Sequence, residues 1–265
     1  MTTKKFVLPQ LYFSKLMRAI TEFELIEEGD KILLGISGGK DSIFMAYAMA
    51  MMQKRLKKNF QLQALTINPM FSEDFDTERI RGFMEELGIP FASFPVDIAG
   101  TIENQGGKDP CYTCAFFFFF AVKRYAKEQG CNKVAYAHHH DDAVETFFMG
   151  LLYSGQLHTF TPKTYLDKMD LTVIRPLVYF REAEIREAIQ YHGFESVPSP
   201  CPYDGHTIRQ KVKDLIQEIS QDNPQLYSHL AAAMRQDAIG ELWAPAKTRK
   251  EMQKQYFSYM YGKQQ

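Results

Sequence analysis

The chain has 265 residues and a formal net charge of −1, with 31 Lys and Arg against 32 Asp and Glu. Hydrophobic residues make up 45% of it and charged residues 24%, proportions that are typical of folded domains and exclude intrinsic disorder. The near-neutral charge argues against a protein that coats nucleic acid non-specifically, because such binding needs many cations, but it is compatible with a local basic patch.

Neither a membrane span nor a secretory leader is predicted. The longest apolar stretches, at 43–52 and 115–122, are shorter than the roughly 20 residues that cross a bilayer. Residues 1–5 form a polar start, and the apolar residues that follow are interrupted by polar ones. We therefore expect a cytoplasmic protein with no membrane contact, in which cysteines bind metal or react rather than form disulfides. The chain has four: Cys111, Cys114, Cys131 and Cys201.

Strand-like and helix-like segments alternate along the chain. Strands are predicted at 31–36, 62–67, 91–96, 133–137 and 171–175. Helices are predicted at 40–58, 77–87, 115–129, 142–153 and 181–192, with a loop at 100–110. Strands joined by helices of this length form a parallel sheet covered on both faces, so we predict an open, doubly wound α/β fold. Ligands of such folds bind beyond the carboxyl ends of the strands.

Helical segments flank this α/β pattern. An amphipathic helix is predicted at 10–23, and from about residue 199 onward only helices are expected, at 207–220 and 224–239. We therefore divide the chain into three parts: an N-terminal helical segment at 1–30, an α/β domain at 31–198, and a C-terminal helical extension at 199–265 that carries the last cysteine.

A phosphate-binding loop is predicted directly after the first strand. The residues are Ser37, Gly38, Gly39, Lys40, Asp41 and Ser42. Two glycines let the backbone approach a polyanion, and the N–H groups that open the next helix supply donors. The spacing is neither that of the Walker loop nor that of the dinucleotide fingerprint. Asp41 would repel bare phosphate unless Mg²⁺ lies between them. The alternative is a plain turn from strand to helix.

Three of the cysteines have the spacing of a metal site. Cys111 and Cys114 stand just before a predicted helix and can face one metal, while prolines on both sides of Cys201 stiffen its backbone. Three thiolates leave one coordination position open, on a zinc ion or on one iron of a cluster. Alone, the Cys-x-x-Cys pair could equally be a redox pair or chance. Cys131 is expected to be a buried apolar residue and no ligand.

A run of three histidines precedes two aspartates where a strand ends and a helix begins. Neighbouring residues on a strand point to opposite faces, so His138, His139 and His140 would not converge on one ion. Asp141 and Asp142 suit the positive end of the helix dipole.

Two motifs of this chain resemble motifs of known protein families. Ser37–Ser42 resembles the SGGxDS signature of the PP-loop ATP pyrophosphatases, and His138–Thr146 resembles the GHHxDDxxxT segment of the tRNA 2-thiocytidine synthetases. The stretch 23–30, the Cys-x-x-Cys pair, the residues IRPLVYFRE at 174–182 and the proline-flanked Cys201 agree in order. The resemblance covers roughly residues 10–220.

The resemblance implies an ATP- and Mg²⁺-dependent tRNA sulfurtransferase. It would adenylate the C2 oxygen of a cytidine at position 32 of the anticodon loop, and sulfur would then displace AMP. A 4Fe-4S cluster on Cys111, Cys114 and Cys201 would carry the sulfur, or a cysteine desulfurase or another donor would deliver it as a persulfide.

The resemblance also assigns site residues. ATP would be held by the phosphate loop together with Ile67 and His138. The catalytic carboxylates would be Asp41 and Asp141 or Asp142, because carboxylates suit Mg²⁺.

The helix after Cys114 departs from that family. Related thiolases carry basic residues there, whereas this chain has five consecutive phenylalanines, Phe116–Phe120. Helical residues advance by about 100° each, so the five rings cannot all face one core. We expect a homodimer contact through this helix, with a base-stacking platform as the alternative. Loss of the cations weakens the case for tRNA, although basic residues gather at 54–58, 209–213 and 247–254.

Two other functions are compatible with the sequence. The same adenylating chemistry could act on another tRNA base or on a small-molecule carbonyl. A non-catalytic, nucleotide-binding metal protein is the third possibility, against which the intact loop argues.

Overall fold

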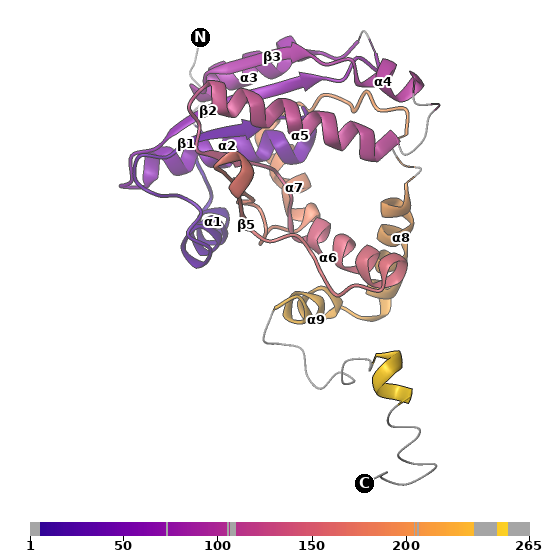
Figure 1. Ribbon diagram of the computed structural model, residues 1–265. Helices are drawn as coiled ribbons and strands as arrows, with labels where there is room; N and C mark the ends of the chain where they lie inside the picture. The colour runs from indigo at the N-terminus through magenta and orange to yellow at the C-terminus, as the bar shows by residue number, and fades with distance from the viewer. Residues whose placement is uncertain are drawn as a thin grey trace.

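The computed structural model describes residues 6–72, 74–104, 106, 110–203, 205, 207–235 and 248–253. Its centre is a six-stranded sheet in the order β3-β2-β1-β4-β6-β5 (Figure 1). The strands are β1 Lys31–Gly35, β2 Gln61–Asn68, β3 Phe91–Pro95, β4 Lys133–Ala135, β5 Lys163–Leu166 and β6 Leu171–Ile174. All neighbouring pairs are parallel except β5 with β6. The strand order reverses between β1 and β4, which is where ligands bind in such sheets.

Helices cover both faces of the sheet. They are α1 Gln10–Glu22, α2 Lys40–Arg55, α3 Thr77–Leu87, α4 Ile98–Asn104, α5 Pro110–Glu128, α6 His140–Met149, α7 Glu182–His192, α8 Ile208–Asp222 and α9 Leu226–Ala233. Alternate residues of β1 join different cores: Ile32 and Leu34 pack with α1, α2 and α7, whereas Leu33 packs with α5. The predicted doubly wound α/β fold is therefore confirmed.

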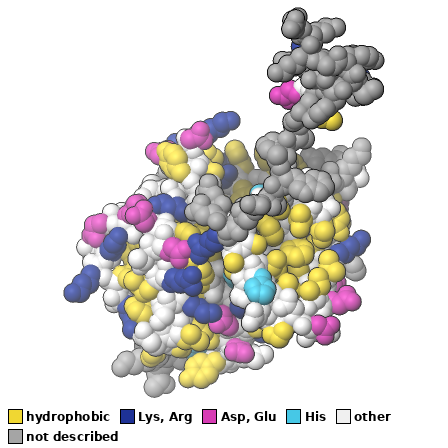
Figure 2. Space-filling view, turned by 90° about the horizontal axis from the view of Figure 1, so that it is seen from below, with side chains coloured by type: hydrophobic (Ala, Val, Ile, Leu, Met, Phe, Trp, Pro, Cys, Tyr) yellow, Lys and Arg dark blue, Asp and Glu magenta, His cyan; other side chains and the backbone are white. Residues whose placement is uncertain are grey.

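The C-terminal helices pack beside α6. Val144 of α6, Val212 and Ile216 of α8, and Leu226 of α9 form a small third core. Figure 1 shows these helices away from the sheet, with α8 beside α6 and α9 below it. Figure 2 views the molecule from that side, where Lys and Arg side chains gather on one half and hydrophobic side chains on the other. In the described part of the chain, no helix has both the length and the apolar character of a membrane span.

Four elements differ from the sequence-based expectation. The loop predicted at 100–110 contains α4, whose buried Ile98 and Ile102 are four residues apart and surround a glycine. The edge strand β5 was not predicted, because only four residues form it and it pairs antiparallel. Helix α5 begins at Pro110, which suits the first helical position, so its cysteines lie within the helix rather than before it. Helix α9 ends at Ala233, and residues 236–239 of the predicted helix lie outside the described residues.

Candidate active site

The loop between β1 and α2 contains the motif Ser37–Ser42 and turns at Gly38. Gly38 has φ +85°, in the left-handed region where a side chain is strained. A Cβ at this position would also lie 3.0 Å from Cδ1 of Ile80 and 3.1 Å from Cβ of Val197. The N–H of Val197 donates to the carbonyl oxygen of Gly38 at 2.8 Å. Both the backbone and the packing therefore require glycine here.

The two serines of the motif hold the loop in shape. The Ser42 hydroxyl donates to the carbonyl oxygen of Gly39 at 2.9 Å, and the Ser37 hydroxyl donates to Oγ of Ser42 at 3.2 Å. Helix α2 begins at Lys40, with Gly39 as its N-cap and no side-chain cap. The first N–H groups of α2 are thus available to a ligand, and helix starts of this kind bind phosphate.

Lys40 is held by two carboxylates. Its Nζ lies 3.1 Å from Oδ2 of Asp41 and 2.9 Å from Oε1 of Glu182, at the start of α7. Burial lowers the pKa of Lys40, but the charges of Asp41 and Glu182 outweigh burial and raise it. Lys40 is therefore a fixed cation beside the loop.

One oxygen of Asp41 lacks a hydrogen bond. Its Oδ1 is buried and has no hydrogen-bond partner among the described residues, and Nε2 of His139 lies 3.7 Å away. Nδ1 of His139 accepts the N–H of Asp142 at 3.4 Å, which assigns the ring proton to Nε2, facing Asp41. A buried carboxylate oxygen beside a phosphate-binding loop suits Mg²⁺, which prefers oxygen ligands.

The other two carboxylates predicted to be catalytic are engaged within the protein. Asp142 accepts the backbone N–H of His139 at 2.9 Å and so completes a capping box at the start of α6. Asp141 is buried, and its Oδ2 accepts Nε of Arg181 at 3.0 Å and the N–H of Glu182 at 2.9 Å. Both residues position α6 and α7 beside the loop.

Two predicted nucleotide contacts lie on the α5 side of the sheet. Ile67, at the end of β2, is buried in the core that packs against α5. The ring of His138 lies 6.0 Å from that of Tyr136 and 5.2 Å from that of Phe160. Burial lowers the pKa of His138 to about 4, so its imidazole is neutral at pH 7. Its Nδ1 is buried and lacks a partner within the described ranges.

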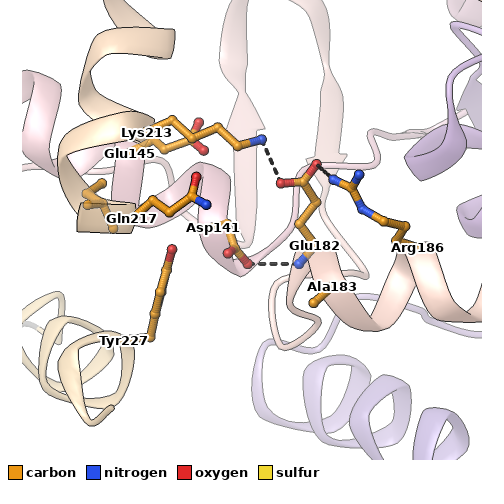
Figure 3. Close-up of a pocket in the computed structure, with 9 residues that line it drawn as sticks. Asp141, Glu145, Glu182, Ala183, Arg186, Lys213, Gln217 and Tyr227 are labelled. Atoms are coloured by element: carbon orange, nitrogen blue, oxygen red, sulfur yellow. Dashed lines mark hydrogen bonds and ion pairs between the residues drawn. The ribbon is translucent and has the colours of Figure 1, made fainter. Parts of the chain in front are cut away.

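A cavity of about 220 Å³ is lined by residues of α6, α7 and the C-terminal helices (Figure 3). Its charged lining residues are Asp141, Glu145, Glu182, Arg186 and Lys213. Glu182 accepts Nζ of Lys213 at 2.6 Å and Nη2 of Arg186 at 3.1 Å. Burial raises the pKa of Glu182, but the hydrogen bonds from Lys213 and Lys40 outweigh burial and lower it to about 2. Glu182 thus links the phosphate loop to α8.

The three cysteines with metal-site spacing line one apolar cavity of about 310 Å³. Its walls are formed by Phe71, Pro110, Cys111, Cys114, Ala115, Phe118, Phe119, Cys201 and Tyr203. Burial and the nearby charges of Cys201 and Cys111 raise the pKa of the Cys114 thiol. Cys131 lies elsewhere, buried in the core under α5, as predicted.

This donor set suits a cluster better than a single ion. Among the described residues, no group of three His, Cys, Asp or Glu is arranged to hold one metal ion. An iron–sulfur cluster bridges thiols that are farther apart than the ligands of a single ion, and thiolates are its usual ligands. The three thiol donors and the volume of the cavity therefore fit such a cluster. The chain from Val197 to Cys201 connects the cavity to the phosphate loop, which Val197 contacts.

Two site residues were not singled out by the sequence. His139, rather than His138, faces Asp41, and its signal was the spacing of three residues to Asp142 that a capping box requires. Glu182 belongs to a recognised segment, but its contact with Lys40 depends on the strand order.

Known proteins with similar sequences or folds include PP-loop proteins and tRNA thiolases. A family model described as a PP-loop domain matches residues 12–218. The tRNA-cytidine(32) 2-sulfurtransferase of Ralstonia pickettii (strain 12J) is 32% identical, over 84% of this chain and 71% of that protein. Its counterpart in Syntrophotalea carbinolica (strain DSM 2380 / NBRC 103641 / GraBd1) is 33% identical, over 82% of this chain and 85% of that protein. A solved U34-tRNA thiolase from Methanococcus maripaludis with its 4Fe-4S cluster shares the fold, with a TM-score of 0.69 and 22% identity over 84% of this chain and 77% of that one.

Proposed function

Because the chain belongs to the PP-loop ATP pyrophosphatases, within the family of tRNA 2-thiocytidine synthetases, we propose that it replaces the C2 oxygen of a tRNA cytidine with sulfur. The target is cytidine 32 of the anticodon loop, as the names of the relatives indicate. The observation that carries the proposal is the meeting of two sites at one sheet edge. The phosphate loop and the three-thiol cavity are joined there by the chain from Val197 to Cys201.

The phosphate loop activates the base. The N–H groups at the start of α2 and the ammonium of Lys40 bind the phosphates of ATP, and Asp41 holds Mg²⁺ through its unpaired oxygen. The C2 oxygen of cytosine attacks the α-phosphorus, and pyrophosphate leaves. The oxygen then becomes part of AMP, which is a better leaving group than oxide. The ammonium of Lys40, which Asp41 and Glu182 hold in place, stabilises the negative charge that develops during this transfer.

The cysteine cavity holds the sulfur chemistry. Cys111, Cys114 and Cys201 would hold a 4Fe-4S cluster, which supplies one iron with a position open to an external sulfur ligand. The aromatic walls of Phe118 and Phe119 exclude water from the activated carbon, so that hydrolysis does not compete with sulfur transfer. Sulfide attacks C2, and AMP leaves with the former C2 oxygen. Where a cysteine desulfurase supplies the sulfur as a persulfide, a thiol reductant must provide the two electrons that bring it to the sulfide level.

The test combines pyrophosphate release with nucleoside analysis. Anaerobically reconstituted protein receives ATP, Mg²⁺, sulfide and a tRNA transcript with either cytidine or uridine at position 32. We expect pyrophosphate and 2-thiocytidine in equal amounts from the cytidine transcript and neither from the uridine transcript. Asp41→Asn should lose both products. Thiolation of a different base would replace the proposed target, and ATP cleavage without any thionucleoside would contradict tRNA thiolation.

The phenylalanine helix favours one alternative acceptor. Phe116–Phe120 leave this part of α5 without cations, which is compatible with the same chemistry on another tRNA base. Mass spectrometry of all tRNA nucleosides from a deletion strain separates the two acceptors. Loss of 2-thiocytidine alone supports position 32, and loss of another thionucleoside supports the alternative.

A further inference from the structure

Three aromatic rings form an exposed stripe along α5. Tyr112, Phe116 and Phe120 follow one another at four-residue spacing and are 72%, 55% and 53% exposed. The intervening Phe118 and Phe119 instead pack against the core and line the cysteine cavity. The phenylalanine run therefore divides into a buried face and a solvent face, and only the buried face is explained by folding.

The stripe borders the opening of the cysteine cavity. Cys111 and Ala115 line that cavity and are themselves exposed, and each immediately precedes a member of the stripe. One residue is a rotation of about 100° around a helix, so the stripe lies next to the cavity rim. From Tyr112 to Phe120 the helix rises about 12 Å, which is the length of three to four stacked bases at about 3.4 Å each.

We propose that Tyr112, Phe116 and Phe120 form a stacking surface for the unpaired nucleotides that flank the target base. The proposal rests on the proposed function, since a base that enters the cysteine cavity places its neighbours over the rim. The rings of Tyr112 and Phe116 are stacked, with centroids 6.5 Å apart and planes inclined by 24°, so the stripe already arranges aromatic rings nearly parallel. Bases of single-stranded loops stack on such side chains without sequence preference.

Charge on the same helix supports an RNA occupant over a second copy of the chain. Lys123, Arg124 and Lys127 follow the stripe and can meet phosphates, although Arg124 also pairs with Glu128 at 3.4 Å. The exposed parts of the three rings offer roughly 300–400 Å², well below the roughly 800 Å² per partner of a stable protein interface. A second copy on the stripe would also cover the rim that the target base must pass.

The test separates aromatic stacking from simple apolar contact. An RNA hairpin of the anticodon stem and loop, with 2-aminopurine beside the target cytidine, is titrated with the full-length protein. Phe116→Leu keeps an apolar side chain and removes the ring, whereas Phe116→Tyr keeps the ring. Tyr191→Leu is the matched control, because Tyr191 is 82% exposed on α7, outside the lining of the cysteine cavity.

We expect hairpin affinity to fall only when the aromatic ring of Phe116 is removed. A stacked base is worth about 1–3 kcal/mol, so Phe116→Leu should weaken hairpin binding about 5- to 150-fold and relieve the quenching of 2-aminopurine. Phe116→Tyr and Tyr191→Leu should stay within about twofold of the parent. Equal binding by Phe116→Leu would overturn the proposal, as would a shift from dimer to monomer in sedimentation with RNA binding unchanged.

Failure of the proposed function would give a different pattern. Hairpin binding is measured without ATP turnover, so it tests the stacking surface separately from the reaction. If the parent protein makes no 2-thiocytidine but Phe116→Leu still weakens hairpin binding, the stacking surface is supported and the proposed reaction is contradicted. If Phe116→Leu thiolates tRNA normally at low RNA concentration, the proposed reaction is supported and the stacking surface is contradicted.

Discussion

On the phosphate-loop side of the sheet edge, charged groups hold one another in place. Lys40 is bound by Asp41 and Glu182, and Glu182 in turn is bound by Lys213 and Arg186. On the cysteine side, the walls around the thiols are aromatic and apolar. The first side is organised by charge before a ligand arrives, whereas on the second side burial and the neighbouring thiols raise the pKa of Cys114 and so disfavour its thiolate.

This difference matches the two halves of the proposed reaction. Transfer of a nucleotidyl group develops negative charge, and fixed cations stabilise it without reorganisation. Displacement by sulfur at an activated carbon must compete with water, and an apolar cavity removes the competitor. The comparison predicts that damage to one side should leave the other side working, which separate assays of nucleotide binding and sulfur transfer can test.

Removal of one cysteine ligand should have the largest effect and should spare the phosphate loop. We expect Cys201→Ala to lose the visible chromophore after anaerobic reconstitution and to lower thiolation at least about 100-fold, because two thiols cannot replace three. ATP affinity should change less than about threefold. Cys131→Ala is the matched control, since that thiol is buried in the core and should leave the chromophore intact. Full thiolation by cluster-free protein would remove the cluster from the reaction.

Gly38→Ala should damage the phosphate loop and spare the cysteine cavity. The new Cβ meets Ile80 at 3.0 Å at a backbone φ of +85°, so the loop must shift. We expect a loss of about 1–3 kcal/mol in the free energy of unfolding and a loss of ATP binding of at least tenfold. The chromophore should form normally.

Gly82→Ala is the matched control for Gly38→Ala. Gly82 lies in α3, and a Cβ there would meet no atom within 4 Å. This substitution should stabilise the helix by up to about 1 kcal/mol, as measured by urea denaturation. If both alanine variants bound ATP equally well, the loop would not be as tightly constrained as its packing indicates.

The same contrast explains which parts were predictable from sequence. The phosphate loop consists of six consecutive residues whose roles depend on local backbone chemistry, and the structure places it between a strand and a helix as predicted. The alternation of strands and helices likewise predicted the doubly wound sheet. Helical periodicity predicted that the five phenylalanines cannot all face one core, and Phe116 and Phe120 are indeed exposed, although the sequence did not indicate which rings would be.

The missed features depend on distant segments. The contact between Lys40 and Glu182 joins the loop after β1 to the start of α7, and no local pattern encodes that approach. Which histidine faces Asp41 was decided by the capping box at the start of α6, so strand alternation alone could not identify His139. Strand β5 is held by its pairing with β6, and its four residues carry too little periodicity to predict it.

The smallest expected effect is on the free energy of unfolding, to which the ion pairs of Glu182 contribute. The pH dependence of this contribution would distinguish the charged side from the apolar cysteine cavity. Because the pKa of Glu182 is about 2 in the folded protein and near 4.5 when unperturbed, the unfolded chain takes up its proton first as the pH falls. Glu182 therefore contributes stability fully above about pH 4.5 and loses it towards pH 2. Partial exposure of its partners limits this contribution to about 1 kcal/mol.

Urea denaturation of Glu182→Gln and the parent should accordingly differ by a constant amount between pH 5 and 7, and the difference should shrink by pH 3. Lys213→Gln should lose a similar amount at pH 7, because Nζ of Lys213 lies 2.6 Å from Glu182. Lys211→Gln, at an exposed position of the same helix, should change stability by less than about 0.5 kcal/mol. A difference between Glu182→Gln and the parent that did not vary with pH would mean that packing, rather than charge, holds α8 to the phosphate loop.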